Sequence, residues 1–187
     1  MLSTAELPFI TKTLIPKGRD YIVRRDRLLD PLKSRLNKKV QIIYATAGYG
    51  KTALLVEFAS GVDLPLSWYS FSPEDHEPLS FLRYCVHAVR ARFPDFGASI
   101  LSLLISGSST DWRSLLGLFI TALHSEVSGR LIFVFDDVHW TQKKGELEEA
   151  LSLLIERAPR NVQFLLGSRI WPDLDCLPKL AAENELE

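Results

Sequence analysis

The sequence has few cysteines and no long uninterrupted apolar run. Its two cysteines, Cys85 and Cys176, lie far apart and indicate no disulfide framework, and no charged-then-apolar leader precedes the first motif. We therefore expect a reducing, cytoplasmic location. The longest apolar runs are broken by a charge or a glycine within about ten residues, well short of the ~20 that span a bilayer, so we expect no membrane contact.

Net charge is also nearly absent. The chain has 22 lysines and arginines against 23 aspartates and glutamates, for a formal net charge of −1. Because the two signs are interspersed, the composition does not favour a nucleic-acid groove or an acidic membrane surface as the main partner. With 187 residues and 47% hydrophobic content, the chain is long enough for one well-cored domain and too short for two ordinary ones.

From Val40 onward, short apolar runs alternate with amphipathic segments. Runs typical of buried strands are VQIIYAT (40–46), PLSWYSF (65–71), RLIFVFDD (130–137) and NVQFLLGSR (161–169). Helical spacing of apolar residues predicts helices over 51–60, 79–93, 112–127 (with Asp111 as a possible cap) and 145–158. This alternation predicts an α/β fold with three layers and a mainly parallel central sheet.

The first thirty residues differ from the rest of the chain. They mix prolines with short basic runs, as in PKGRDYIVRRDRLLDPL, and show little sustained periodicity until Leu28. We expect residues 1–30 to form an arm and residues 31–187 to form the core. The basic cluster Arg24, Arg25 and Arg27 is equally well explained as a solvated face. A flexible stretch is expected after Pro94, where SGSST occurs.

The segment YATAGYGKTALL (44–55) carries the strongest functional motif. It follows the phosphate-binding pattern G-x-x-x-x-G-K-[ST], except that Ala45 replaces the first glycine, and we expect this extra methyl group to be tolerated. Gly48 and Gly50 can adopt backbone angles closed to other residues, so that successive N–H groups converge on an anion. Lys51 is predicted to reach the β- and γ-phosphates, and Thr52 to bind Mg²⁺. The predicted nucleotide-binding residues of this loop are Ala47, Gly48, Tyr49, Gly50, Lys51, Thr52 and Ala53.

Two other predicted strands end in polar residues. LIFVFDDVHW places Asp136 where it could hold Mg²⁺ and Asp137 where it could polarise an attacking water. FLLGSR places Arg169 where it could contact the γ-phosphate, with a plain surface arginine as the alternative. For His139 we favour a structural hydrogen bond. In parallel sheets ligands bind beyond the carboxyl ends of the strands, so one site is predicted, with Asp137 and Arg169 catalytic and Thr52 and Asp136 on the metal.

The order of YIVRRDRLLDPL, IIYATAGYGKTALLVEFA, LSWYSF, LIFVFDDVHW and FLLGSR resembles the N-terminal ATPase domain of large LuxR-type transcriptional regulators. These maltose-regulon activator-like proteins belong to the STAND signalling ATPases, relatives of the AAA+ class. The resemblance implies a P-loop NTPase core that binds ATP or ADP with Mg²⁺. It also implies that the loop strand lies beside the arginine strand, which lies beside the aspartate strand, and that Val23 and Arg24 of the arm pack against adenine.

In this family the nucleotide acts as a switch. ATP favours an open, self-associating form, ADP favours a closed, inactive form, and slow hydrolysis resets the switch. Downstream helical repeats sense an inducer, and a C-terminal helix-turn-helix binds DNA. Because the sequence stops at Glu187, without the lid, repeats or helix-turn-helix of that pattern, we expect an isolated nucleotide-binding domain, either excised from a larger regulator or naturally short. Self-association or downstream sensor domains are its expected partners in a full-length protein, and direct DNA binding by this segment is not expected.

Two other functions stay open from the sequence. A small P-loop phosphotransferase would also use the phosphate loop and Mg²⁺, but no arginine cluster follows the aspartate strand to clamp a second phosphorylated substrate. A nucleotide-retaining interaction module without turnover would need the loop but no catalytic step.

Overall fold

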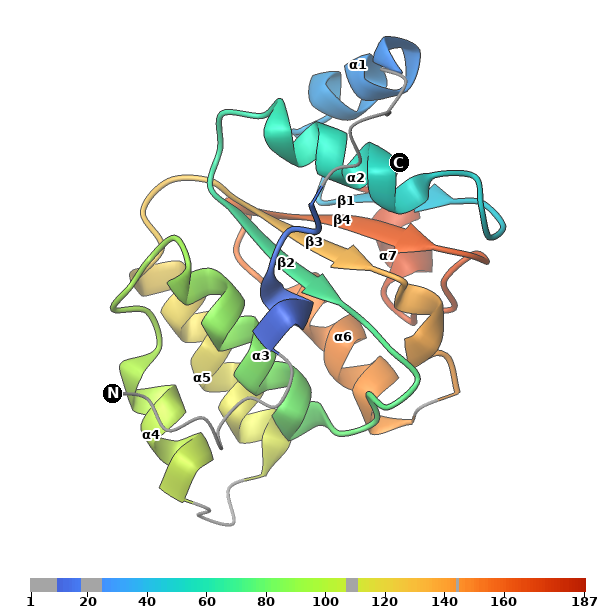
Figure 1. The fold of residues 1–187 in the computed structure, drawn as a ribbon. Helices are drawn as coiled ribbons and strands as arrows, with labels where there is room; N and C mark the ends of the chain where they lie inside the picture. The colour runs from blue at the N-terminus through green and yellow to red at the C-terminus, as the bar shows by residue number, and fades with distance from the viewer. Residues whose placement is uncertain (1–9, 18–24, 107–110, 144) are drawn as a thin grey trace.

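A four-stranded parallel sheet forms the centre of the fold (Figure 1). The computed structural model describes residues 10–17, 25–106, 111–143 and 145–187. The strands are β1 (Val40–Tyr44), β2 (Leu66–Ser70), β3 (Leu131–Asp136) and β4 (Val162–Ser168). They lie in the order β1-β4-β3-β2, and every pairing is parallel. The loop strand therefore lies beside the arginine strand, and that strand lies beside the aspartate strand, as the resemblance implied.

Helices cover both faces of this sheet and complete the three layers (Figure 1). One face packs against α2 (Lys51–Ser60), which carries α1 (Asp26–Ser34) on its outer side. The other face packs against α3 (Pro78–Arg90), α5 (Trp112–Ser125) and α6 (Glu146–Arg157). The same side also has α4 (Ala98–Ser106) and α7 (Leu177–Ala182). Within the described residues, the short 3₁₀ helices are η1 (Ile10–Thr13) and η2 (Val138–Thr141). The predicted fold class is confirmed.

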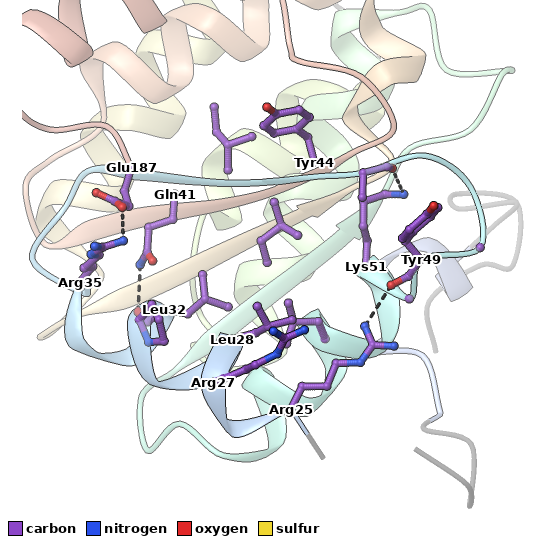
Figure 2. Close-up of a pocket in the computed structure, with 17 residues that line it drawn as sticks. Arg25, Arg27, Leu28, Leu32, Arg35, Gln41, Tyr44, Tyr49, Lys51 and Glu187 are labelled. Atoms are coloured by element: carbon purple, nitrogen blue, oxygen red, sulfur yellow. Dashed lines mark hydrogen bonds and ion pairs between the residues drawn. The ribbon is translucent and has the colours of Figure 1, made fainter. Parts of the chain in front are cut away.

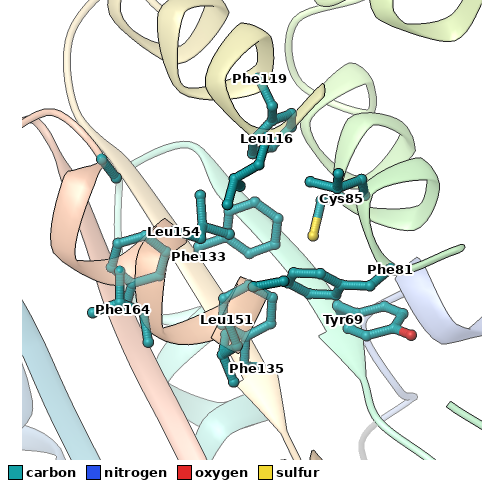
Figure 3. Close-up of a cluster of buried hydrophobic side chains, with 14 of the residues drawn as sticks. Tyr69, Phe81, Cys85, Leu116, Phe119, Phe133, Phe135, Leu151, Leu154 and Phe164 are labelled. Carbon is teal, nitrogen blue, oxygen red and sulfur yellow. The ribbon is translucent and has the colours of Figure 1, made fainter. Parts of the chain in front are cut away.

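Strand β3 shows why the core has two halves. Alternate residues of a strand point to opposite faces, so Ile132 and Val134 pack against the α2 side while Phe133 and Phe135 pack against the other helices. Phe133 and Phe135 stack with ring centroids 4.6 Å apart, and Phe164 of β4 lies 6.0 Å from Phe135 (Figure 3). Every residue of β3 is buried. This apolar packing on both faces fixes the position at which β3 ends.

Helices α1 and α4 are not among those predicted from the sequence. Residues Asp26–Ser34 form α1, which buries Leu29. Pro31 lies inside this helix, and proline disfavours a helix interior, so the sequence did not indicate one. Residues Ala98–Ser106 form α4 within the stretch expected to be flexible. Its exposed face carries serines, Ser99 and Ser102, which favour turns and caps over helix interiors, so the helix signal in the sequence is weak. Residues 107–110 lie outside the described residues.

Several predicted helix ends shift by a few residues. Helix α3 ends at Arg90 instead of residue 93, and α5 ends at Ser125, so Val127 lies beyond it. Asp111 occupies the position before α5, but its side chain makes no capping hydrogen bond. The boundaries of α6 are confirmed to within one residue, with Gly145 before it and Ala158 after it. Helix ends are the least reliable part of a sequence-based assignment because they depend on local hydrogen bonds.

The outer edge of β1 is paired with the end of the chain. Leu186 forms a parallel bridge with Val40. The amide of Val40 donates to the carbonyl of Glu185 at 3.0 Å, and the amide of Ile42 donates to that of Glu187 at 2.8 Å. The acidic sequence ENELE has no strand-like pattern, so the sequence did not indicate this pairing. This pairing satisfies backbone N–H and C=O groups at the start of β1, an edge strand, that would otherwise have no partner strand.

Both cysteines are free and buried, and burial raises the pKa of each thiol.

Within the ranges that the structure describes, no helix combines the length and the apolar character needed to cross a membrane.

Two neighbouring residues of α5 test the packing of the core. Phe119 is fully buried and contacts Phe96 edge-on at 5.5 Å, whereas Leu118 is 44% exposed. We expect Phe119→Ala to lower the free energy of unfolding by about 3–5 kcal/mol because it leaves a cavity. Leu118→Ala, on the same helix, should change it by less than ~0.5 kcal/mol. Urea denaturation measures both, and equal losses would contradict this packing.

Candidate functional site

The glycine loop connects β1 to α2 at the carboxyl edge of the sheet. Gly48 and Gly50 have φ angles of 86° and 76°, in the region that favours glycine. The ammonium group of Lys51, the first residue of α2, donates hydrogen bonds to the carbonyl oxygens of Ala45 and Thr46. Ala45 thus contributes a carbonyl oxygen, which every residue has. Its φ angle is not positive, so this position does not require glycine.

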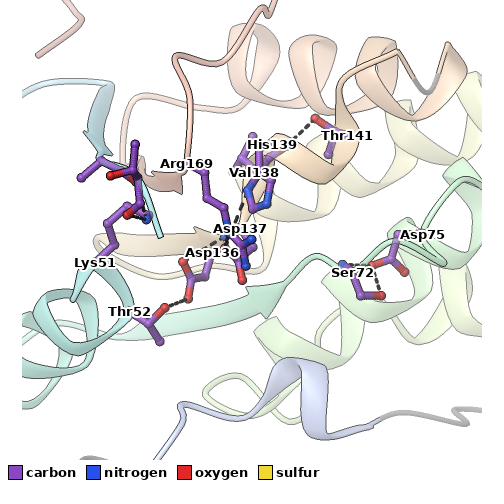
Figure 4. Close-up of polar contacts among 12 residues, drawn as sticks. Lys51, Thr52, Ser72, Asp75, Asp136, Asp137, Val138, His139, Thr141 and Arg169 are labelled. Atoms are coloured by element: carbon purple, nitrogen blue, oxygen red, sulfur yellow. Dashed lines mark hydrogen bonds and ion pairs between the residues drawn. The ribbon is translucent and has the colours of Figure 1, made fainter. Parts of the chain in front are cut away.

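Thr52 and Asp136 form the closest polar contact between the loop helix and the aspartate strand (Figure 4). The Thr52 hydroxyl donates to Oδ2 of Asp136 at 2.6 Å, and the Asp137 amide donates to Oδ1 at 2.9 Å. Burial raises the pKa of the Asp136 carboxyl, and the charge of Asp137 acts in the same direction. The hydrogen bond from Thr52 and the charge of Lys51 oppose that rise. A cation beside Asp136 would favour its charged form.

Gly167 of β4 makes this contact possible. A Cβ atom at this position would lie 2.6 Å from Oδ1 of Asp136 and 2.8 Å from Cδ1 of Leu55. The strand therefore needs glycine here so that the buried carboxylate and α2 can approach it. We did not predict this role, although a glycine within an apolar strand is a known sign of close approach.

Asp137 lies at the centre of a second polar group (Figure 4). It has a φ of 55°, which aspartate adopts more readily than most residues, and it turns the chain from β3 into η2. Its Oδ1 lies 3.8 Å from Nε of Arg169 and 3.7 Å from Nδ1 of His139. The structure thus brings together the two residues predicted to be catalytic, at the ends of β3 and β4.

The expected structural hydrogen bond of His139 is not present among the described residues. Both of its ring nitrogens are buried without a hydrogen-bond partner there. Its ring packs against Trp140 with centroids 4.8 Å apart. Burial lowers the pKa of His139, Asp137 raises it, and Arg169 and Lys51 lower it further. The imidazole is therefore held mainly by packing and is disfavoured as a cation.

A cavity of about 520 Å³ joins these groups at the carboxyl edge of the sheet. Its lining includes these predicted site residues: Ala47, Gly48, Gly50, Lys51, Thr52, Ala53, Asp137 and Arg169. Asp136 is buried behind Thr52, and the 70% exposed Tyr49 faces a different cavity. Pro16 and Lys17 of the arm also line this phosphate-loop cavity, which the sequence did not indicate. Val23 and Arg24 lie outside the described residues.

A larger cavity of about 830 Å³ lies between α1 and β1, on the other side of the loop (Figure 2). It shares Gly48, Gly50 and Lys51 with the phosphate-loop cavity, so the two meet at the loop. An ion pair between Arg35 and Glu187 lies on its lining. The cavity between α1 and β1 is the larger of the two. The predicted catalytic residues, Asp137 and Arg169, nevertheless line only the phosphate-loop cavity. We therefore place the chemistry there.

Arg25 is more than part of a solvated basic face. Its Nη1 donates to the carbonyl oxygen of Tyr49 at 3.0 Å, and its guanidinium lies against Gly50, where a Cβ atom would be 2.8 Å from Nη2 (Figure 2). The arginine therefore supports the loop from outside. Sequence reasoning placed it only within a basic cluster, because nothing in a run of arginines shows which one touches the loop.

A parallel sheet ordered β1-β4-β3-β2, with a glycine loop between β1 and a helix, is the fold of a P-loop ATPase. Solved structures agree with this assignment. The Walker-type ATPase PABY2304 of Pyrococcus abyssi matches 81% of this chain and 46% of its own, with a TM-score of 0.55 and 15% identity. The Aeropyrum pernix ORC1 protein, solved in complex with DNA, matches 92% of this chain and 45% of its own, with a TM-score of 0.51 and 15% identity. At such identity the likeness shows the fold alone.

In sequence, this chain is similar to proteins named HTH-type transcriptional regulator MalT. The HTH-type transcriptional regulator MalT of Serratia proteamaculans is 33% identical over 155 residues, or 81% of this chain. MalT of Cronobacter sakazakii is 29% identical over 175 residues, or 92% of the chain. The chain spans only 16% and 19% of the lengths of these relatives. No family model matches it. Together these likenesses support a nucleotide-binding regulatory domain.

The close approach at Gly167 can be tested with a matched pair of glycines. Gly167→Ala should lower the free energy of unfolding by about 1–3 kcal/mol, because the new methyl group overlaps the Asp136 carboxylate and Leu55. Gly117→Ala, in the middle of α5 with nothing within 4 Å of its Cβ position, should be neutral or stabilise by up to ~1 kcal/mol. Urea denaturation compares them, and a neutral Gly167→Ala would contradict the geometry.

The charges around His139 predict opposite shifts in two variants. The wild-type imidazole should titrate below its ordinary pKa of 6.5 because it is buried. Asp137→Asn removes a charge that raises this pKa and should lower it further, whereas Arg169→Gln removes a charge that lowers it and should raise it. NMR titration of the ring protons, assigned with His139→Gln, measures the shifts. Movement of both variants in one direction would contradict the arrangement.

Proposed function

We propose that the chain is an ATP- and ADP-binding switch domain that hydrolyses ATP slowly with Mg²⁺ and belongs to a signal-responsive transcriptional regulator. The observation that carries this proposal is the phosphate-loop cavity, where the glycine loop, Lys51, Asp137 and Arg169 meet from three separate parts of the chain. The likeness to MalT regulators and to P-loop ATPases supports the same function.

The polyphosphate is assigned to the phosphate-loop cavity. Positive φ angles at Gly48 and Gly50 and the start of α2 present backbone N–H groups to an anion. Lys51 is already held at the loop by two carbonyl oxygens and needs only a rotation of its side chain to reach a phosphate. Arg169 lies on the same lining, where it contacts the terminal phosphate of ATP and loses that contact in ADP.

The oxygen atoms of the Thr52 hydroxyl and the Asp136 carboxylate are suitable ligands for a magnesium ion. Mg²⁺ prefers oxygen ligands and is commonly bound through one or two protein groups together with phosphates and waters. A hydroxyl and a carboxylate oxygen 2.6 Å apart are such a pair. No cluster of three or more histidine, cysteine, aspartate or glutamate side chains suited to a metal occurs in the described part of the chain. The ion would neutralise phosphate charge, and the protein would supply Thr52 directly and Asp136 directly or through water.

We assign to Asp137 the role of polarising the attacking water. Its carboxylate is 31% exposed and lines the phosphate-loop cavity, so water can reach it, unlike the buried Asp136. Its positive φ angle marks the turn from β3 into η2, so the side chain starts from a well-defined backbone position. Nε of Arg169 lies 3.8 Å from this carboxylate. Slow turnover is expected because the described residues of this lining include no other carboxylate and no histidine.

We assign the nucleoside to the larger cavity, between α1 and β1. That cavity meets the phosphate-loop cavity at Gly48, Gly50 and Lys51 and has apolar walls from Leu28 and Ile43. A base lying there would pass close to Arg25, which touches the loop at Tyr49. The packing of adenine against Val23 and Arg24, directly before Arg25, is part of the proposal.

The regulatory part of the proposal rests on the relatives. They are named HTH-type transcriptional regulators, and the chain corresponds to a small share of their length. In such a protein, exchange between ATP and ADP in this cavity would control self-association or contacts with downstream sensor domains. Direct DNA binding is not assigned to this segment.

Two substitutions separate binding from hydrolysis. Lys51→Ala should weaken ATP binding by about 100-fold or more, because a charged partner of the phosphates is lost at a cost of about 3 kcal/mol. Asp137→Ala should bind ATP and release no phosphate above background. Calorimetry and a phosphate-release assay measure the two effects.

Equal ATP affinity in wild type and Lys51→Ala would refute the proposed site. Binding without phosphate release in the wild type would instead identify a nucleotide-retaining module, and ATP consumption that requires a small acceptor would identify a phosphotransferase. Thermal unfolding without nucleotide checks that each variant is folded.

A further inference from the structure

The arm is anchored to the carboxyl end of β2, at the same sheet edge as the site. Helix η1 packs on β2 and α3. The ammonium of Lys12 donates to Oγ of Ser72 and lies 2.7 Å from both that atom and Oδ1 of Asp75. The side chains of Lys12 and Asp75 are only 13% and 9% exposed, and Asp75 also accepts the amide of Ser72 at 2.8 Å. A partly buried, multiply bonded ion pair of this kind holds its segment more firmly than a surface pair does.

From this anchor the arm runs across the sheet edge towards the glycine loop (Figure 1). Lys17 follows Lys12 by five residues and, with Pro16, lines the phosphate-loop cavity that also contains Asp137 and Arg169. Proline fixes its own φ angle and restricts the residue before it, so the backbone next to Lys17 has few conformations. The arm is therefore one wall of the site.

The charge of the cavity fits a terminal phosphate. Among the described residues, the charged groups on its lining are Lys17, Lys51, Arg169 and Asp137, which are three cations and one carboxylate. Lys51 is buried and bonded to the loop, whereas Lys17 is exposed on the lining of the same cavity. A flexible ammonium group is well suited to a phosphate as a point charge.

We propose that Lys17 is a further nucleotide-binding residue that contacts the terminal phosphate of ATP, and that the contact of Lys12 with Asp75 and Ser72 positions it. This inference rests on the proposed function and deepens it, because it makes the arm a part of the site that distinguishes ATP from ADP. The arm then responds to the presence of the terminal phosphate, together with Arg169.

The test is calorimetric titration of the full 187-residue chain with ATP, ADP and AMP in the presence of Mg²⁺. Lys17→Gln should weaken ATP binding about tenfold, weaken ADP binding less and leave AMP binding unchanged, and Lys17→Arg should restore most of the loss. Lys33→Gln on α1, which removes the same charge from a residue that lines neither cavity, is the matched control and should bind like wild type.

The anchor is tested by a double-mutant cycle. Lys12→Met alone should weaken ATP binding more than ADP binding, and adding Lys17→Gln should cause little further loss because the two residues act in series. Lys12→Arg should keep the anchor and the affinity. A purely structural role of Lys12 would instead lower the melting temperature and weaken all three nucleotides equally, which would overturn the positioning role.

The outcomes separate this inference from the proposed function. If Lys51→Ala loses ATP while Lys17→Gln binds ATP, ADP and AMP like wild type, the inference is wrong and the proposed function stands. If the wild-type chain binds none of the three nucleotides, the proposed function fails and the inference fails with it. A loss that is equal for ATP and AMP in Lys17→Gln would also overturn the contact with the terminal phosphate.

Discussion

The hydrogen bond between Thr52 and Asp136 is the contact on which the site depends. It ties the first turn of α2 to the end of β3, although β4 lies between β3 and the strand that leads into α2. It can form only because Gly167 in β4 leaves room for the carboxylate. Once these elements are tied together, the glycine loop and the ends of β3 and β4 lie at fixed positions around one cavity. The aromatic packing of Phe133 and Phe135, on the face of the sheet opposite α2, supports this arrangement.

The sequence predicted what local pattern and strand burial determine. Apolar runs gave the four strands, because strands covered on both faces have little room for polar residues. The parallel order then placed Asp136, Asp137 and Arg169 at one edge with Lys51. The loop angles at Gly48 and Gly50 also follow from residue type. These features required no knowledge of distant contacts beyond the alternation of strands and helices.

What the sequence did not reveal depends on contacts between distant segments. Helix α1 contains a proline, and α4 has serines on its exposed face, so its stability depends on burial of residues such as Ile100. The place of Lys17 on the cavity wall depends on an ion pair between Lys12 and Asp75, 63 residues apart. His139 was assigned a hydrogen bond by its type, but packing against Trp140 decides its environment. In each case, tertiary contacts override local preference.

The central claim is that nucleotide phosphates lie in the phosphate-loop cavity with a metal ion at Thr52 and Asp136. The most direct measurement is a crystal structure of the chain with a non-hydrolysable ATP analogue and Mn²⁺, in which anomalous scattering locates the metal. We expect a metal peak about 2.1–2.2 Å from Oγ1 of Thr52, with Asp136 bound to it directly or through one water. A metal peak away from this pair, or phosphates lying in the cavity between α1 and β1, would contradict it.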